Sequence, residues 1–425
     1  MKNSKKTTGK KANKLSTESD QEGGVIIYNP FINDNKLIKM KYNEQTDEIE
    51  YENLRGMANI FTQEQKKDID AFINFVLPFM VEPGGNKIVG PDIIEKLEVI
   101  GAGTFGVTLA YNKLLIKILR VDQNRLDSVA EELNISGVLF YDDIGNRYQS
   151  VPPTINHIYG YITSNEQIYN RLIHRPALDQ NYRSHKLFTN MPIIDVPKLS
   201  QAIRNLTVNV NRPMQGHIAM LFLKKADLSL TNFITGLRTL AFNHKILAVS
   251  KFISDMHSAL KYIHIDRGYI HNDIKPDNVV VFVGSYTSPT HFQLIDFGLL
   301  TKIVDLDENQ RRRGGTPSYM TGIYQQRTNI FYDWHCVLLS ALQMLDYNIG
   351  GQFYNKTAHA FQTDITTFLD GLKAGQVVDQ QTNYELTQVI NSMVTIYKYY
   401  SYSVDMEQNK NARTNNINAI IGAMY

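Results

Sequence analysis

The residues of this chain that are best suited to chemistry lie in one polar island between two apolar runs. Asp273, Lys275 and Asn278 fall within six residues, and the apolar run Val279–Val283 follows them directly. A connection that only had to turn the chain would use Gly, Pro, Asn or Ser here. A carboxylate, an ammonium and a carboxamide at this spacing offer a base, a cation for phosphate and an oxygen ligand for a metal.

A second acidic residue, Asp296, stands at the end of another apolar strand, Leu294–Gly298. It follows Asn278 by eighteen residues, which is enough for one strand, a turn and a second strand. Carboxylate and amide oxygens are the ligands that Mg²⁺ prefers. Two strand ends that present Asp273, Asn278 and Asp296 therefore predict a site for magnesium and phosphate.

A glycine-rich segment, Gly101-Ala-Gly103-Thr-Phe-Gly106, precedes these residues in the chain. Dinucleotide-binding folds share the GxGxxG pattern, but they need a helix directly after the glycines. Here the apolar alternation after Gly106 predicts a strand. A glycine-rich strand–turn–strand lets backbone N–H groups approach a triphosphate closely.

Lys117 lies inside the apolar strand predicted over Leu114–Leu119. An ammonium there is costly unless an anion meets it. Alternatively, Lys117 could lie on an edge strand and extend its ammonium into water. The glycines just upstream favour a phosphate contact instead. The helix predicted over Leu126–Phe140 offers Glu131 and Glu132 as its partners. Glu132 lies beside the apolar stripe of that helix, so we expect Glu132 to pair with Lys117.

Five motifs of this chain, taken in order, resemble those of the eukaryotic-type protein kinases: the glycine loop, Lys117, His271–Asn278, Asp296–Gly298 and Gly315–Tyr319. The five-residue step from Asp273 to Asn278 matches the family motif, and the ordered set is far more specific than any member. The resemblance covers residues 93–345 clearly. It implies an α+β, bilobal protein-kinase fold, with a small antiparallel-sheet lobe carrying one main helix, a larger and mainly helical lobe, and ATP in the cleft.

The resemblance also implies a role for each matching residue of the larger lobe. Asp273 would be the catalytic base, and Lys275 would steady the γ-phosphate, as in serine/threonine kinases. Asn278 and Asp296 would be the two Mg²⁺ ligands. The loop Gly315-Thr316 would receive the acceptor residue of a protein substrate.

In the smaller lobe, the resemblance assigns residues to ATP. Gly101, Gly103 and Gly106 would cover the phosphates. Lys117 would contact the α- and β-phosphates and pair with Glu132. The implied activity is transfer of the γ-phosphate to protein hydroxyls with ATP and Mg²⁺ as cofactors.

Two positions depart from the family pattern, and so do two lengths: the interval from Gly106 to Lys117 is short and the insertion at 162–215 is long. Asn272 replaces the arginine that reads a phosphate on the activation loop, so we expect no requirement for that phosphorylation. Thr321–Ile323 stand in place of the Ala-Pro-Glu signature, as in casein-kinase-1-like branches, which leaves the usual glutamate–arginine tie in doubt. The form Tyr332-Asp-Trp-His335 is similar to kinases of large DNA viruses of the poxvirus type, with Asp333 expected to bond the catalytic-loop backbone.

Four regions are expected along the chain. Residues 1–22 form a disordered lysine-rich tail, and residues 23–92 an irregular extension with one helix over Thr62–Phe79. Residues 93–223 form the small lobe, with three strands, a hairpin turn at 112–113 and an insertion at about 162–215. Residues 224–425 form the large lobe and tail, with helices over 244–264, 358–372 and 384–400.

Bulk composition is that of an ordinary globular protein. Hydrophobic residues make up 43%, charged residues 20%, and the net charge is +2, which gives no electrostatic reason to expect a nucleic-acid partner. The single cysteine fits a reducing compartment, and the longest apolar stretch, Ala71–Met80, is too short to span a bilayer. We expect a soluble, intracellular protein, in host cytoplasm or virion if it is viral.

Two other functions are compatible with parts of the pattern. A pseudokinase scaffold would bind nucleotide or a partner without turnover, but the retained Lys117, Asp273, Asn278 and Asp296 favour an enzyme. A small-molecule kinase would generally lack the peptide-receiving loop that Gly315–Tyr319 resembles.

Overall fold

The computed structural model describes the chain in segments: residues 25–28, 37–43, 48–53, 75, 96–102, 106–121, 129, 139, 151–156, 158–163, 217–283, 291–303, 310–311, 314–320, 324, 327–346, 358–374, 380–408 and 425. Several predictions fall outside these residues. They concern Gly103, Glu131, Glu132, the tail at 1–22, nearly all of the insertion at 162–215, and the Thr321–Ile323 segment.

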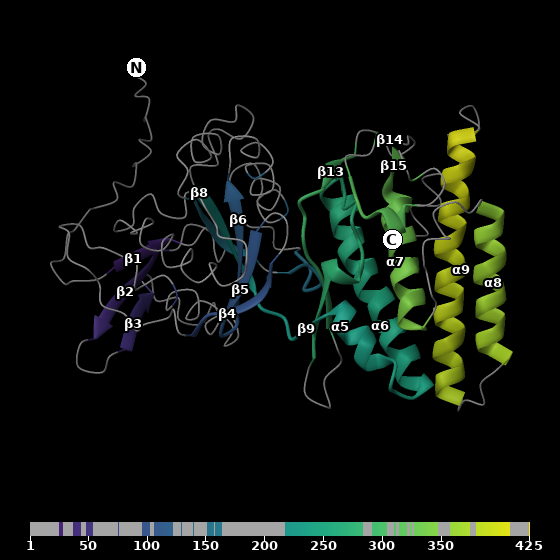
Figure 1. Ribbon diagram of the computed structural model, residues 1–425, viewed down its shortest axis with the longest axis horizontal. Coiled ribbons are helices and arrows are strands. Elements are labelled where there is room, and N and C mark those ends of the chain that lie inside the picture. Colours follow the sequence, from purple (N-terminus) through teal and green to yellow (C-terminus); the bar gives the residue numbers. More distant parts are fainter. Residues whose placement is uncertain are drawn as a thin grey trace, which may run out of the picture.

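A five-stranded antiparallel sheet forms the smaller lobe (Figure 1). Its strands are β4 (Glu98–Ala102), β5 (Gly106–Tyr111), β6 (Leu114–Val121), β7 (Ile158–Thr163) and β8 (His217–Lys224), in the order β4-β5-β6-β8-β7. The three predicted strands and the hairpin turn at 112–113 are confirmed. Asn112 has a φ of 51° in that turn, a conformation that Asn tolerates better than most residues.

One helical residue before this sheet, Phe75, packs on it. The Phe75 ring centroid lies 5.8 Å from that of Tyr111 and 5.6 Å from that of Phe222, and the residue is fully buried. This fits the helix predicted over Thr62–Phe79, of which only Phe75 is described. Val129 and Leu139, inside the helix predicted over Leu126–Phe140, are likewise helical and buried.

The larger lobe is mainly helical (Figure 1). Its helices are α5 (Leu230–Leu237), α6 (Phe242–Leu260), α7 (Ile330–Met344), α8 (Ala358–Ala374) and α9 (Gln380–Gln408). The predicted helices are confirmed, with α9 longer than expected. Residues 330–342 of α7 are all buried, which makes α7 the central helix of this lobe.

Short strands flank the candidate site residues of the larger lobe. β11 (Val279–Phe282) pairs with β12 (His291–Leu294) on one side and with β9 (Leu228–Ser229) on the other. β10 (Tyr269–Ile270) pairs with β13 (Thr301–Lys302), and β14 (Gln310–Arg311) with β15 (Arg327–Thr328). The stretch His271–Asn278, which is predicted to be the catalytic loop, therefore runs from β10 to β11, as its apolar flanks predicted.

The N-terminal extension differs from the irregular segment that was expected. It contains a three-stranded antiparallel sheet of β1 (Val25–Tyr28), β2 (Leu37–Asn43) and β3 (Glu48–Asn53). Its register places Lys39 opposite Glu52 and Lys41 opposite Glu50. Opposite charges at directly paired positions stabilise an antiparallel pair, and this alternation was the signal that the prediction missed.

The two lobes meet along residues 151–156. Ile155 forms a parallel bridge with Leu294 of β12, where Asn156 N–H donates to the Leu294 oxygen (3.1 Å) and Leu294 N–H to the Thr154 oxygen (2.8 Å). The Asn156 side chain also donates to the Lys224 carbonyl oxygen at the end of β8 (3.3 Å). This segment thus ties the strand before Asp296 to the end of the smaller lobe's sheet. Among the described helices, none is long and apolar enough to cross a membrane.

Candidate active site

Asp273 is the centre of a compact polar cluster. Its carboxylate accepts hydrogen bonds from Asn278 Nδ2 (2.8 Å) and the Thr316 hydroxyl (2.6 Å), and it lies 3.0 Å from Lys275 Nζ. Pro276 begins a single 3₁₀ turn, Pro276–Asn278, that reverses the chain and brings Asn278 back to Asp273. All of the predicted catalytic-loop residues are therefore brought together.

Thr316 links Lys275 to Asp273. Lys275 Nζ donates to the Thr316 hydroxyl oxygen (2.8 Å), and that hydroxyl donates to Asp273 Oδ1. A hydroxyl between an ammonium and a carboxylate has its oxygen held by the cation and its proton directed at a base. The acceptor hydroxyl of a substrate needs the same two contacts during general-base catalysis.

Asn278 and Asp296 lie side by side through strand pairing. The Asn278 carbonyl oxygen accepts from Ile295 N–H (3.0 Å), directly before Asp296, in continuation of the β11–β12 pairing. Both of the Asn278 side-chain bonds use its Nδ2, to the backbone and side chain of Asp273. Its Oδ1 therefore remains for a cation. The described residues contain no cluster of three or more His, Cys, Asp or Glu that could hold a metal, but one amide and one carboxylate oxygen suit Mg²⁺, which completes its shell with water and phosphate.

Lys117 lies against Asp296. Its Nζ is 3.1 Å from Asp296 Oδ1, so the ion pair joins the smaller lobe's sheet to the predicted metal ligand of the larger lobe. Burial alone would raise the pKa of Asp296. The charge and hydrogen bond of Lys117, with further help from His271 and Lys275, outweigh burial and hold the pKa of Asp296 below its usual value. Asp296 is therefore ionised throughout the neutral range.

Two glycines of the predicted phosphate loop, Gly101 and Gly106, differ in whether packing requires a glycine there. A Cβ at Gly106 would lie 1.9 Å from the carbonyl oxygen of Ile118 on the neighbouring strand, so no other residue fits there. A Cβ at Gly101 would meet nothing within 4 Å. Gly106 is thus required by strand packing, whatever its role at a phosphate, whereas Gly101 is free of such a requirement.

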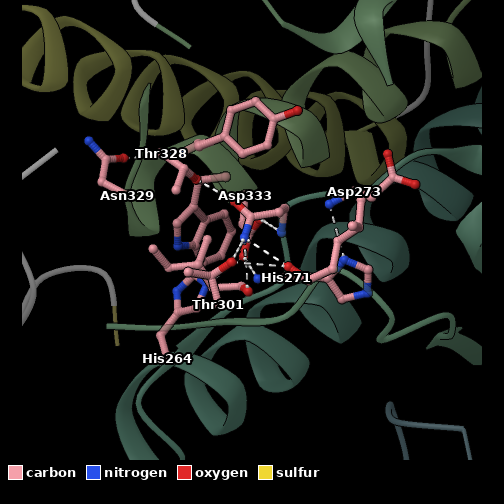
Figure 2. A network of polar contacts seen from close by, with 12 residues as sticks. His264, His271, Asp273, Thr301, Thr328, Asn329 and Asp333 are labelled. Atoms are coloured by element: carbon pink, nitrogen blue, oxygen red, sulfur yellow. Dashed lines mark hydrogen bonds and ion pairs between the residues drawn. The ribbon is translucent and has the colours of Figure 1, made fainter. Parts of the chain in front are cut away.

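Asp333 supports the catalytic loop from behind. Its buried carboxylate accepts from the backbone N–H groups of His271 (2.6 Å) and Asn272 (2.9 Å), and from Nε2 of His264 (2.8 Å). Figure 2 shows Asp333 at the middle of this network, with His264, His271 and Thr301 around it. The prediction that Asp333 bonds the loop backbone is confirmed. A carboxylate with three N–H donors is well satisfied, so its burial is tolerated.

Asn272 occupies the position of the missing arginine and is fully buried. It has a φ of 70°, and its Nδ2 donates to the Leu299 carbonyl oxygen (3.0 Å) and to the Thr301 hydroxyl (2.8 Å). Its Oδ1 accepts from the Thr328 hydroxyl. Asn272 therefore connects the loop to the segment after Asp296 and to the residues just before α7.

Two histidines have contacts that the sequence did not reveal. His271 packs its ring on Phe297 (5.5 Å between centroids) and contacts the Ile295 carbonyl oxygen with Nε2 (3.1 Å). His264 is buried, and both of its ring nitrogens are bonded. It lies in a π-helical turn, Lys261–Asp266, where the 3.6-residue period no longer tells which side chains face inward.

The comparisons with known proteins agree with this geometry. Residues 179–348 match the family model of the protein kinase domain. The fold is that of a protein kinase. The matched range contains the catalytic loop, Asp296 and α7, whereas the glycine loop and Lys117 precede it, so their assignment to the kinase site depends on the structure and on the sequence motifs.

Several kinases are similar to this chain over short regions. Calcium-dependent protein kinase 3 of Plasmodium yoelii yoelii is 33% identical over 112 residues, which is 26% of this chain and 20% of that protein. The ovarian-specific serine/threonine-protein kinase Lok of Drosophila melanogaster is 34% identical over 114 residues, 26% of this chain and 21% of Lok. Citron rho-interacting kinase of Rattus norvegicus is 26% identical over 159 residues, 35% of this chain and 7% of the rat protein. The chain spans about a fifth or less of these relatives' length. Together the matches support a protein kinase of the eukaryotic type.

Proposed function

We propose that this chain is an ATP- and Mg²⁺-dependent serine/threonine protein kinase that transfers the γ-phosphate of ATP to hydroxyl groups of proteins. The observation that carries the proposal is the triangle of Asp273, Lys275 and Thr316. Asp273 would accept the proton of the substrate hydroxyl, and Lys275 would hold the γ-phosphate. Phosphoryl transfer depends mainly on such positioning and on charge neutralisation, because its transition state is loose and largely dissociative.

We assign the metal to Asn278 and Asp296. Mg²⁺ held there would neutralise the charge that builds up on the phosphate oxygens. Lys117 lies against Asp296, so the ammonium and the metal-binding carboxylate face the same place. We propose that Lys117, Gly101, Gly103 and Gly106 bind the ATP phosphates, with Glu132 as the partner of Lys117.

The test is phosphate transfer from labelled ATP to casein with Mg²⁺ present. Asp273→Ala removes the proposed base and is expected to lower kcat at least about a hundredfold. Asp266→Ala, at an exposed carboxylate seven residues upstream, is the matched control and should be active. No transfer by the wild type, or equal transfer by Asp273→Ala, would refute the enzyme and favour a pseudokinase scaffold that binds nucleotide or a protein partner.

We also propose that activity needs no phosphate on the activation loop. The support is Asn272, whose side chain finds its partners within the protein: Leu299, Thr301 and Thr328. An arginine at this position would reach for a phosphate, whereas the short amide is fully used without one. Active enzyme treated with a phosphatase should keep its rate, and a loss of turnover after dephosphorylation would contradict the proposal.

We place the chain, more narrowly, near the kinases of large DNA viruses of the poxvirus type, with loss of the Ala-Pro-Glu motif as in casein-kinase-1-like branches. The support is the Tyr332–His335 form and the short hairpin after the glycine loop. A solved poxvirus-type kinase should superpose on residues 106–121 and 327–346 more closely than the Lok or citron kinase domains do. The reverse ranking would remove this placement.

A further inference from the structure

Tyr425 packs against the elements that support the catalytic loop. Its ring centroid lies 5.7 Å from that of His257, 6.1 Å from that of His264 and 6.1 Å from that of Trp334. Lys261 Nζ, at the start of the π turn, donates to its backbone oxygen (3.3 Å). Tyr425 is thus held by α6, by the π turn and by α7, although it is separated from α7 by α8 and α9 in the sequence.

The hydroxyl of Tyr425 has two defined partners. Trp334 Nε1 lies 3.1 Å from the hydroxyl oxygen. An indole N–H only donates, so the Tyr425 oxygen accepts this bond. The hydroxyl proton is then available for Nδ1 of His264, which it also contacts.

His264 passes this contact on to Asp333. Its Nε2 lies 2.8 Å from Asp333 Oδ2, and both side chains are fully buried. A neutral imidazole has one donor and one acceptor nitrogen. Because the carboxylate of Asp333 only accepts, the neutral form of His264 carries its proton on Nε2 and accepts at Nδ1. Tyr425 supplies the donor that this tautomer requires, and so favours the form of His264 that donates to Asp333.

Asp333 in turn holds the backbone N–H groups of His271 and Asn272, directly before Asp273. A continuous hydrogen-bond chain therefore runs from Trp334 through Tyr425, His264 and Asp333 to the catalytic loop. We propose that Tyr425 is a positioning residue for phosphoryl transfer: its hydroxyl keeps His264 donating to Asp333, and Asp333 fixes the backbone that carries the base. The inference depends on the proposed kinase function.

The first test is the kinetics of Tyr425→Phe in the full chain. The change removes one oxygen and keeps the ring contacts. We expect kcat to fall about fivefold, which corresponds to about 1 kcal/mol, with the KM for ATP unchanged because no ATP-contacting residue is touched. Tyr384→Phe is the matched control, since Tyr384 lies on α9 with 59% of its surface exposed. It should keep the wild-type kcat.

The second test needs no activity. Trp334 is the single tryptophan of the chain, so its fluorescence emission reports the bond to Tyr425 directly. We expect Tyr425→Phe to shift the emission maximum and Tyr384→Phe to leave it unchanged, both measured well below the unfolding midpoint. An inactive wild type would refute the proposed function alone. An unchanged Trp334 emission, or an unchanged kcat in folded Tyr425→Phe, would refute the positioning role alone.

Discussion

The side chain of Asn272 is expected to hold the catalytic loop against the segment after Asp296, and a pair of substitutions measures this. Asn272→Gly removes the side chain while keeping a residue that adopts a φ of 70° without strain. Asn272→Ala removes the same bonds but, unlike glycine, keeps a Cβ, which is strained in the left-handed region when no side-chain bond compensates. The difference between the two variants therefore separates the backbone contribution from the side-chain contribution.

The magnitude follows from the contacts. The side chain of Asn272 bonds to Ile270, Leu299, Thr301 and Thr328. Each contributes about 1 kcal/mol net, and buried partners left without a bond add to the loss. We expect Asn272→Gly to lower the free energy of unfolding by about 2–4 kcal/mol and Asn272→Ala by about 1–2 kcal/mol more.

Asn112 provides the matched control, because it also has a positive φ, 51°, but is exposed in the β5–β6 turn. Asn112→Gly should change stability by only a few tenths of a kcal/mol, while Asn112→Ala measures the left-handed strain alone. Urea unfolding of the four variants gives the comparison, and casein phosphorylation shows whether kcat falls for the variants at 272 only. If Asn272→Gly is no more destabilising than Asn112→Gly, the side-chain bonds do not hold the loop.

Three further predictions concern other parts of the site. Gly106→Ala should destabilise the smaller lobe strongly, because its Cβ would lie 1.9 Å from the Ile118 carbonyl oxygen, whereas Gly101→Ala should leave the unfolding midpoint unchanged; equal midpoints would contradict the strand-packing argument. Thr316→Val should lower kcat about tenfold by removing the hydroxyl between Lys275 and Asp273, and Thr316→Ser should restore it; a Val variant as active as the Ser variant would rule this out. Lys117→Met should raise the pKa of Asp296, because the charge that opposes burial is lost. In the wild type the pKa of Asp296 lies below its usual value, so the variant should take up its proton at a higher pH than the wild type as the pH falls. An NMR titration of Asp296 would detect this shift. An unchanged titration would show that Lys117 does not control the pKa of Asp296.

Much of the catalytic site could be predicted because its residues are close in sequence. Asp273, Lys275 and Asn278 meet through one 3₁₀ turn, so their spacing alone specifies that they converge. The strand ends at Asn278 and Asp296 were readable from apolar runs that stop at polar residues. Lys117 in an apolar strand predicted an anionic partner, and it contacts Asp296; its contact with Glu132 lies outside the described residues and stays a prediction.

The parts that could not be predicted depend on distant partners or on a local change of helical period. His264 has no carboxylate at helical spacing, because its partner Asp333 lies 69 residues further along the chain. The π turn also buries Tyr262, Ile263 and His264 in succession, which no regular amphipathic pattern does. The reason for glycine at 106 is the backbone of a neighbouring strand, and a sequence motif cannot separate that from phosphate binding.

Asn272 holds the catalytic loop through both its backbone and its side chain, and its backbone conformation explains how. Its N–H points to Asp333 while its side chain reaches Leu299, Thr301 and Thr328. Asn is among the few non-glycine residues that adopt a positive φ readily, and its amide both donates and accepts, whereas a guanidinium only donates. An arginine could not accept from Thr328, so it would lose that tie and require an added anion for its charge. On the function proposed above, the replacement would substitute contacts within the chain for a contact with phosphate. Regulation of this site would then have to act on the residues that hold the catalytic loop in place. Of these, the hydrogen-bonded series from Trp334 through Tyr425 and His264 to Asp333 reaches furthest from the cleft.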